Sequence, residues 1–459
     1  MYLLEIVWGE VGIKLGQLLL SLSILVILHE FGHYITARWF GCRVDRFFLF
    51  FDPWFALFKK KVGDTVYGIG WLPLGGYVKI AGMIDESMDR DQLNQPPQPW
   101  EFRSKPAWQR LIVMLGGIIM NVITAIVIYA FIAMIWGEKR VPLQSLKYGV
   151  AVQDSLLYQI GLQNGDQVET VNGKPVADFK DLALRIAIGD SLVVNRAGQQ
   201  VKLVIPVDMI GKLVERKRSM LVLPRTPGII GLVADSAGAA NAGLKPADQI
   251  VAINEQPVSF FDQIAPLVQN HKGATVQVKY LRGKDTLTTP VAVNKDGKLG
   301  LAPFSYPYVS FAQMDSAGLL QYQIIKHSAL GALPAGLRLA QKSLVDYVDQ
   351  FKKIIQPKSG GYKAVGGFKA IGNLFAPVWN WESFWLLTAF LSIMLAFMNL
   401  LPIPALDGGH VLFTLIEMIT GRKPNQKFLE YAQVVGMVLL LGLMLYANGN
   451  DWLGWGKNK

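Results

Sequence analysis

The chain is poor in cysteine, histidine and charge: its 459 residues include one cysteine, five histidines and 17% charged residues. The lone Cys42 excludes an intramolecular disulfide and a zinc site built from cysteines. Low charge and a hydrophobic fraction of 51% exclude a disordered chain and indicate an integral membrane protein with soluble parts. The net charge of +11 is spread along the chain without a basic block. We therefore interpret the positive charges as flanks of membrane segments and expect no nucleic-acid partner.

Four apolar stretches approach the length of a membrane-spanning helix, which is about 20 residues. They cover residues 14–40, 111–136, 384–401 and 428–446. The first stretch is preceded by Glu5 and Glu10 and lacks the basic start of a cleavable signal, so we expect it to stay in the membrane.

Basic residues gather in the two short connections between these stretches. They are Arg38, Arg43, Arg46, Arg103, Lys105, Arg110, Arg422, Lys423 and Lys427. Because such clusters mark the cytoplasmic side, we expect both termini and the long middle region to lie outside the cytoplasm. Lys139 and Arg140, on the outer side of the second stretch, run against this rule.

The middle region contains an internal repeat, in which residues 161–176 align without gaps to residues 243–258. Each copy has a glycine turn ending in Asp, a short apolar strand, a tight turn and a predicted helix, over 181–188 or 262–268. Alternation predicts further strands at 201–207 and 275–281. The pattern resembles tandem PDZ domains of bacterial proteases, which implies two peptide-binding grooves; two rigid spacers without ligand remain the alternative.

The sequence His29-Glu30-Phe31-Gly32-His33 directly follows an apolar run, so one helix is expected to carry it inside the membrane. Residues i and i+4 share a helix face, so His29 and His33 can chelate one Zn²⁺, with Glu30 placed to polarise a zinc-bound water. Ionisable groups at that depth indicate function, although a pair of core histidines is the structural alternative.

A third zinc ligand has to come from far along the chain, because no Glu occurs between Glu30 and Glu86. The candidate is Asp407, in the sequence Asn-Leu-Leu-Pro-Ile-Pro-Ala-Leu-Asp-Gly-Gly-His over residues 399–410. An Asp near the bilayer interior needs a partner. Two prolines prevent a regular helix there, and unwound backbone at this depth is tolerated only around a protein-lined or watery cavity.

HExxH in a first membrane helix, paired with this later Pro- and Gly-containing motif, resembles the site-2 protease family of intramembrane zinc metalloproteases. The resemblance implies that His29, His33 and Asp407 bind Zn²⁺, that Glu30 is catalytic and that Asn399 holds the substrate backbone. His410 is expected to be structural or to support a ligand, and residues 117–121 match the family's Gly-x-x-x-Asn motif.

The alternating segment 65–79 is expected to form a strand or hairpin that dips toward the membrane and offers an edge to an extended substrate. Gly68, Gly70 and Trp71 are its candidate substrate-binding residues. The resemblance implies a single-span membrane protein as substrate, such as an anti-sigma factor trimmed on its outer side or a leftover signal peptide. It also implies the cytoplasmic membrane of a bacterium, with termini and PDZ-like domains in the periplasm.

The sequence therefore predicts an α-helical membrane protein with four transmembrane helices, a membrane-associated β-hairpin and two inserted α/β PDZ-like domains. The expected divisions are 1–137 with HExxH, 138–220 and 221–309 for the repeats, 310–381 for a membrane-surface helix and return loop, and 382–459 with the third ligand. The alternatives to a protease are a non-catalytic PDZ-based adaptor and a metal or proton transporter.

Overall fold

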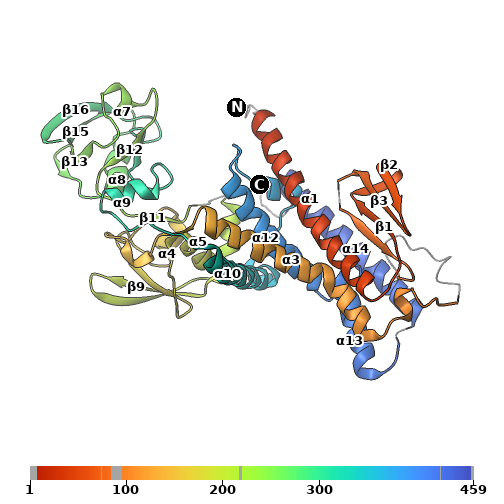
Figure 1. Cartoon of the computed structure of the whole chain (residues 1–459). Helices are drawn as coiled ribbons and strands as arrows, with labels where there is room; N and C mark the ends of the chain where they lie inside the picture. The colour runs from red at the N-terminus through yellow and green to blue at the C-terminus, as the bar shows by residue number, and fades with distance from the viewer. Residues whose placement is uncertain (1–7, 74, 84–95, 217–219, 424, 456–459) are drawn as a thin grey trace. The chain divides into compact units, whose positions relative to one another are not determined.

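The computed structural model describes residues 8–73, 75–83, 96–216, 220–423 and 425–455 (Figure 1). The chain divides into two compact units. The membrane unit lies within Met1–Gly137, Lys326–Lys352 and Val365–Lys459, and the repeat unit comprises Glu138–Ile325 and Lys353–Ala364.

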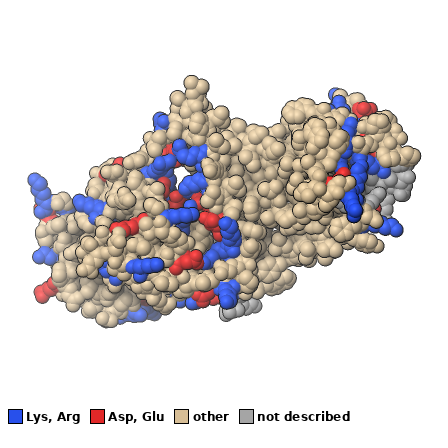
Figure 2. All heavy atoms as spheres, turned by 90° about the horizontal axis from the view of Figure 1, so that it is seen from below, with Lys and Arg blue, Asp and Glu red and all other residues tan. Residues whose placement is uncertain are grey.

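Among the described residues of the membrane unit, four helices are long and apolar enough to cross a bilayer, in the places where the sequence predicted spans. They are α1 (Trp8–Trp39), α3 (Ala107–Ile135), α12 (Trp381–Leu400) and α14 (Gln426–Leu453). Many of their exposed side chains are large and apolar, as in Val435, Val438 and Leu439 of α14. In Figure 2 the surface over these helices has almost no charged side chains, whereas charges of both signs gather over the repeat unit. A surface of this kind suits lipid.

The third span ends where the prolines predicted that it would. Helix α12 stops at Leu400, two residues before Pro402, which cannot continue the hydrogen-bond ladder. A separate helix, α13 (Asp407–Thr420), then begins at the proposed third ligand, so Asp407 is the first residue of a new helix and lies outside the span. Helix α13 was not predicted from the sequence.

A four-stranded sheet packs beside α1 in place of the expected lone hairpin. Its strand order is β2-β3-β1-β4, and a short helical turn, η1 (Phe102–Ser104), follows in the chain. The strands are β1 (Val44–Leu49), β2 (Phe51–Val62), β3 (Thr65–Leu72) and β4 (Tyr77–Ile80). The segment predicted as a hairpin supplies β3 and β4, which lie on opposite sides of β1 and do not pair with each other.

Residues 310–372 are more broken than expected. They form α9 (Phe311–Ser316), β18 (Gln323–Ile325), α10 (Ala329–Ile355), the turns η4 (Pro357–Ser359) and η5 (Gly361–Ala364), and α11 (Phe368–Gly372). The middle of α10 packs against two spans: the Tyr129 hydroxyl of α3 donates to Ser343, and Tyr347 meets Phe397 of α12 edge to face. Exposed leucines such as Leu330 and Leu337 leave an apolar stripe, as expected for a helix in contact with lipid.

The two sequence repeats fold in the same way. The first has the sheet β10-β9-β7-β8 and the second β14-β13-β15-β16, and in each copy a further pair of strands, β6 with β11 or β12 with β17, completes the structure. The first copy comprises β6 (Val150–Val152), α4 (Ser155–Gln159), β7 (Gln167–Val171), β8 (Lys174–Pro175), α5 (Phe179–Ile188), β9 (Ser191–Arg196), β10 (Gln199–Val204), α6 (Met209–Glu215) and β11 (Val222–Pro224). The second comprises β12 (Ile230–Val233), α7 (Gly238–Asn241), β13 (Gln249–Ile253), β14 (Gln256–Pro257), η3 (Phe261–Gln263), α8 (Ile264–Gln269), β15 (Thr275–Arg282), β16 (Asp285–Ala292) and β17 (Leu301–Pro303). Since β11 pairs with β6, strand pairing extends the first copy beyond the expected boundary at residue 220. Before the first copy come β5 (Glu138–Arg140), which pairs with β18, and η2 (Leu143–Ser145).

Each copy is held by the same ion pair, between a buried aspartate and a partly exposed arginine. Asp166 accepts two hydrogen bonds from Arg196, each 2.8 Å long, and Asp248 accepts bonds of 2.8 and 2.7 Å from Arg282. Each carboxylate also accepts a backbone N–H from the turn that precedes it, which closes the glycine turn of the repeat. The repeat motif predicted the two Asp but not their arginine partners.

We expect replacement of Asp248 by Asn to destabilise the second copy by about 1–2 kcal/mol, because the buried carboxylate loses its charge-assisted hydrogen bonds to the partly exposed Arg282. Burial acts to raise the pKa of Asp248, but the hydrogen bonds from Arg282 and the Lys245 N–H lower it below its ordinary value. The ionised form therefore stabilises the fold above the unfolded-state pKa of about 4, and this contribution fades as the pH falls below it. Amide hydrogen exchange in β13 and β15 should be faster in the variant at pH 7, with a smaller difference near pH 3.5. Asp285→Asn, an exposed acid of the same sheet, should change neither rate; equal protection in all three proteins would contradict the assignment.

Candidate metal centre

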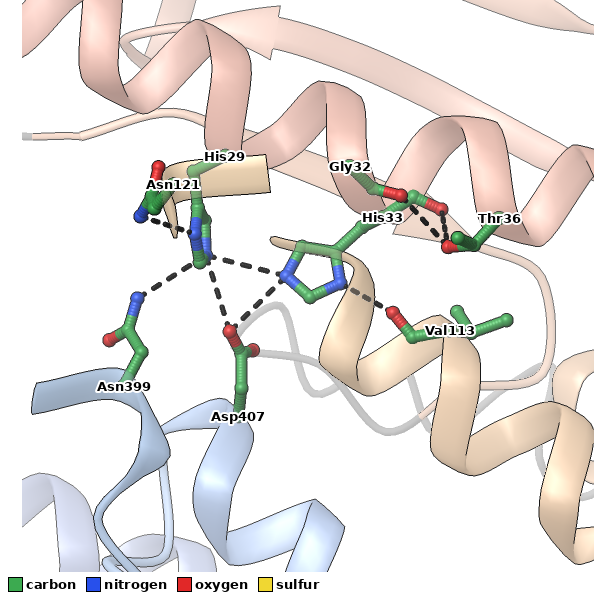
Figure 3. Close-up of polar contacts among 8 residues, drawn as sticks. All are labelled: His29, Gly32, His33, Thr36, Val113, Asn121, Asn399 and Asp407. Atoms are coloured by element: carbon green, nitrogen blue, oxygen red, sulfur yellow. Dashed lines mark hydrogen bonds and ion pairs between the residues drawn. The ribbon is translucent and has the colours of Figure 1, made fainter. Parts of the chain in front are cut away.

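Three side chains from remote segments converge on one point (Figure 3). The Nε2 atoms of His29 and His33 each lie 3.2 Å from Oδ2 of Asp407 and 3.3 Å from each other. Both imidazoles belong to α1, and Asp407 begins α13. The side chains of the three residues are at most 19% exposed. The structure thus brings together the three residues that the sequence proposed as ligands.

The spacing of these atoms fits a tetrahedral zinc ion. With zinc–nitrogen and zinc–oxygen distances of about 2.0–2.2 Å, neighbouring ligands of a tetrahedron lie about 3.3–3.5 Å apart. The three separations of 3.2–3.3 Å are close to that value. Two imidazoles and one carboxylate also leave a fourth position open, as in catalytic zinc sites.

The cluster lies toward one end of the spans. At about 1.5 Å per residue, α1 runs about 30 Å from Gly9 to His29 but only about 9 Å from His33 to Trp39. The contacts of the cluster on α3 and α12 come from Val113 and the central Asn121 of α3 and from the last turn of α12. On α1 and α12 the site therefore lies near the helix end that the positive charges predict to be cytoplasmic.

Glycines allow α1 and α3 to approach closely at the site. A Cβ on Gly32 would lie 2.2 Å from the carbonyl oxygen of Gly116, and a Cβ on Gly116 would lie 2.5 Å from that of Gly32. A Cβ on Gly117 would meet Nε2 of His33 at 2.4 Å and Cε1 of His29 at 2.6 Å. Gly32 and Gly116 thus set the helix separation, and Gly117 makes room for the imidazoles themselves.

The loop after α12 is folded tightly against the start of α13. A Cβ on Gly408 would lie 2.2 Å from the Leu401 carbonyl oxygen, and Ala405 adopts a left-handed φ of +75°. On the other side, a Cβ on Gly436 of α14 would come within 1.7 Å of the Pro404 carbonyl oxygen. The fourth span therefore packs directly on the turn that presents Asp407.

Helix α3 also contacts α13 through a buried ion pair. Arg110 donates to Glu417 over 2.5 Å, and both side chains are at most 12% exposed. Helix α13 carries Asp407 at its other end, and α3 packs against His29 and His33. The ion pair therefore fixes the helix of the third ligand against the helix that contacts the other two. In the sequence Arg110 counts only among the flanking positive charges, and no pattern singles out Glu417.

The second nitrogen of each histidine contacts α3. Nδ1 of His33 lies 2.8 Å from the carbonyl oxygen of Val113, which can only accept, so Nδ1 carries the proton and Nε2 keeps its lone pair. Nδ1 of His29 lies 3.1 Å from the Asn121 amide. Asn399 from α12 places Nδ2 3.3 Å from Nε2 of His29, so the proposed substrate-holding residue lies at the cluster.

Glu30 lies between α1 and the sheet. The backbone N–H of Val78 in β4 hydrogen-bonds its carboxylate, and a Cβ on Gly76 would lie 3.6 Å from Cγ of Glu30. Glu30 is not part of the three-residue ligand group, which consists of His29, His33 and Asp407. Glu30 is thus adjacent to a ligand in sequence but does not belong to the ligand group. This position suits a general base.

The proposed substrate residues of β3 lie farther from a free edge than expected. Gly68, Gly70 and Trp71 belong to a strand that pairs with β1 on one side and β2 on the other. The Trp71 indole donates to the Pro53 carbonyl over 2.8 Å and stacks on Trp54. Strand β4, by contrast, borders α1 and pairs only with β1 among the described strands. His410 contacts Gln433 of α14 over 3.1 Å and is outside the cluster.

The chain is similar to known proteins over nearly its whole length. The model of peptidase family M50 matches residues 17–443. The regulator of sigma-E protease RseP of Salmonella typhimurium is 27% identical over 98% of this chain and 99% of its own length. Two proteins named as putative zinc metalloproteases are also similar. The one from Vibrio cholerae is 28% identical over 98% of this chain and 99% of its own length. The one from Neisseria meningitidis is 27% identical over 94% of this chain and 97% of its own length.

Proposed function

This chain belongs to peptidase family M50 and is a zinc metalloprotease, and we propose that it cuts peptide bonds within the membrane-spanning segments of other proteins. One observation carries the proposal. The atoms of His29, His33 and Asp407 that would bind the metal lie within 3.3 Å of one another, at the meeting point of helices that are apolar enough to span a membrane. Since the chain is a protease, the adaptor and transporter alternatives are set aside.

His29, His33 and Asp407 would hold the zinc ion. When bound, zinc supplies a Lewis acid that acidifies a coordinated water and polarises the scissile carbonyl. Glu30 accepts the proton of the attacking water and delivers it to the departing amide nitrogen. The amide of Asn399, which both donates and accepts, lies beside His29 and holds the substrate backbone near the reacting bond.

The substrate must be extended before it is cut, because a helix hides its peptide groups in its own hydrogen bonds. Strand β4 offers replacement partners beside the metal cluster. Its Val78 N–H bonds Glu30 in the structure, so pairing of substrate with β4 would bring the scissile bond next to the proton acceptor. Gly68, Gly70 and Trp71 then affect substrate binding indirectly, because they shape the sheet to which β4 belongs.

The name of the Salmonella relative, a regulator of sigma-E protease, supports a role in regulated intramembrane proteolysis. The substrates are then single-span proteins such as an anti-sigma factor, already trimmed on the outer side, or leftover signal peptides. The two copies in the repeat unit act as PDZ-like domains on the periplasmic side of the bacterial inner membrane, where they exclude bulky, untrimmed proteins or bind a peptide.

The test is cleavage of a single-span substrate by the purified chain in lipid. The chain should cut within the span, stop when zinc is removed by a chelator and resume when zinc is returned. His29→Ala should abolish both zinc binding and cleavage, whereas His271→Ala, on the repeat unit, should change neither. Cleavage by metal-free protein, or cleavage only outside the span, would contradict the proposal.

A further inference from the structure

Asn121 of α3 lies at the meeting point of three helices, directly behind one ligand. Its side chain is fully buried, and its amide nitrogen lies 3.1 Å from Nδ1 of His29. Its backbone carbonyl accepts a bond of 2.7 Å from Ser392 of α12, so the residue is fixed from a second side. Its Oδ1 atom, however, is buried and has no hydrogen-bond partner among the residues that the structure describes.

The two ends of an amide group have nearly the same shape, so hydrogen-bond chemistry decides which end faces the ring. If Nδ2 faces His29, it donates to Nδ1, and the neutral ring must carry its proton on Nε2. That proton would then point at Asp407 and His33, where a metal ligand needs a lone pair. If Oδ1 faces His29, it accepts a proton from Nδ1, the Nε2 lone pair is free, and the orphaned oxygen gains a partner.

His33 already shows the second arrangement. Its Nδ1–H donates to the Val113 carbonyl, which leaves Nε2 as the ligand atom. With Asn121 turned in the same sense, α3 would supply one acceptor to each histidine of α1. A hydrogen bond of this type fixes the ring's orientation and tautomer and raises its basicity toward a metal.

We propose that Asn121 is the positioning residue of His29: its Oδ1 accepts the Nδ1 proton and holds the imidazole with its Nε2 lone pair toward the metal site. This inference rests on the zinc site of the proposed function and adds a residue that touches neither metal nor substrate. The proposed role requires a hydrogen-bond acceptor at position 121. A role in helix packing would require only a side chain of the right size.

The experiment measures the zinc dissociation constant of the full-length protein by competition with a chelating dye. Asn121→Leu keeps the volume but removes the acceptor, and we expect it to weaken zinc binding about 10–100-fold. Asn121→Asp keeps an acceptor and should bind zinc within a few-fold of the wild type. Asn450→Leu, which replaces another buried asparagine of a spanning helix, should leave the constant unchanged.

The visible spectrum of the cobalt-substituted proteins gives a second readout that is independent of activity. The Asn121→Asp protein should keep the wild-type ligand-field bands, and Asn121→Leu should shift or weaken them. An Asn121→Leu protein with wild-type affinity would overturn the proposal, as would Asn121→Asp binding zinc no better than Asn121→Leu. Zinc binding that survives His29→Ala would instead overturn the metal site itself.

Discussion

Glu30→Gln is expected to reduce the rate of cleavage by about 10³–10⁴-fold while zinc remains bound at one ion per chain. Gln keeps the size of the side chain, and its carbonyl oxygen can still accept the Val78 N–H. It cannot accept a proton from the attacking water, so the loss should fall on the chemical step. The measurement is single-turnover cleavage of a single-span substrate, with zinc content determined on the same sample.

Glu10→Gln is the matched control, since it removes an exposed acid from the same helix, far from the cluster. It should leave both rate and zinc content unchanged. A Glu30→Gln enzyme that keeps more than a tenth of the wild-type rate would remove Glu30 from the proton-transfer role. Loss of zinc together with activity would indicate that Glu30 supports the ligands instead.

The ligand set could be predicted because its residues are rare and costly where they occur. A histidine pair at helical spacing after an apolar run has few structural explanations, and Asp407 follows prolines that must interrupt a span. The structure brings these segments together as expected. The two repeats could be predicted for the same reason, because their turns need particular residues such as Gly161 and Gly243, both at positive φ.

What could not be predicted depends on contacts between segments that have no pattern of their own. Arg196 and Arg282 lie at different distances along the chain from their Asp partners, so the gap-free repeat does not include them. Strand β2 has exposed Trp54 and Phe55 in succession and no alternation, which gives no strand signal. The partner of His29, Asn121, belonged to a recognised motif, but only the structure places it against the ring.

Helix α13 was missed for a related reason. Its apolar residues follow a proline-rich turn and precede basic residues, so they read as a short connection between two spans. Its position is set by tertiary contacts, through the Arg110–Glu417 pair and the packing of Gly436 on Pro404. The geometry of Asp407 therefore depends on residues that carry none of the chemistry.

Gly117→Ala is expected to weaken zinc binding by at least about 100-fold and to abolish detectable cleavage. The added methyl would lie 2.4 Å from Nε2 of His33 and 2.6 Å from Cε1 of His29, well inside contact distance. The rings cannot simply turn away, because Val113 and Asn121 hold their other nitrogens on the same helix. The methyl therefore has to displace the ligand atoms or separate α1 from α3.

Two further glycines make this prediction specific. Gly16→Ala, on α1, would place its new Cβ more than 4 Å from the other described parts of the chain, leaving aside its own helix backbone, and should bind zinc and cleave as the wild type does. Gly116→Ala meets the Gly32 carbonyl oxygen at 2.5 Å but no ligand atom among its nearest neighbours, so it should weaken zinc binding less than Gly117→Ala. Protease resistance of each purified variant checks that the helices remain folded. A folded Gly117→Ala protein that bound zinc as tightly as Gly16→Ala would contradict this prediction. Such a result would mean that a methyl group fits beside the two imidazoles, so that the site does not need the close approach of α3.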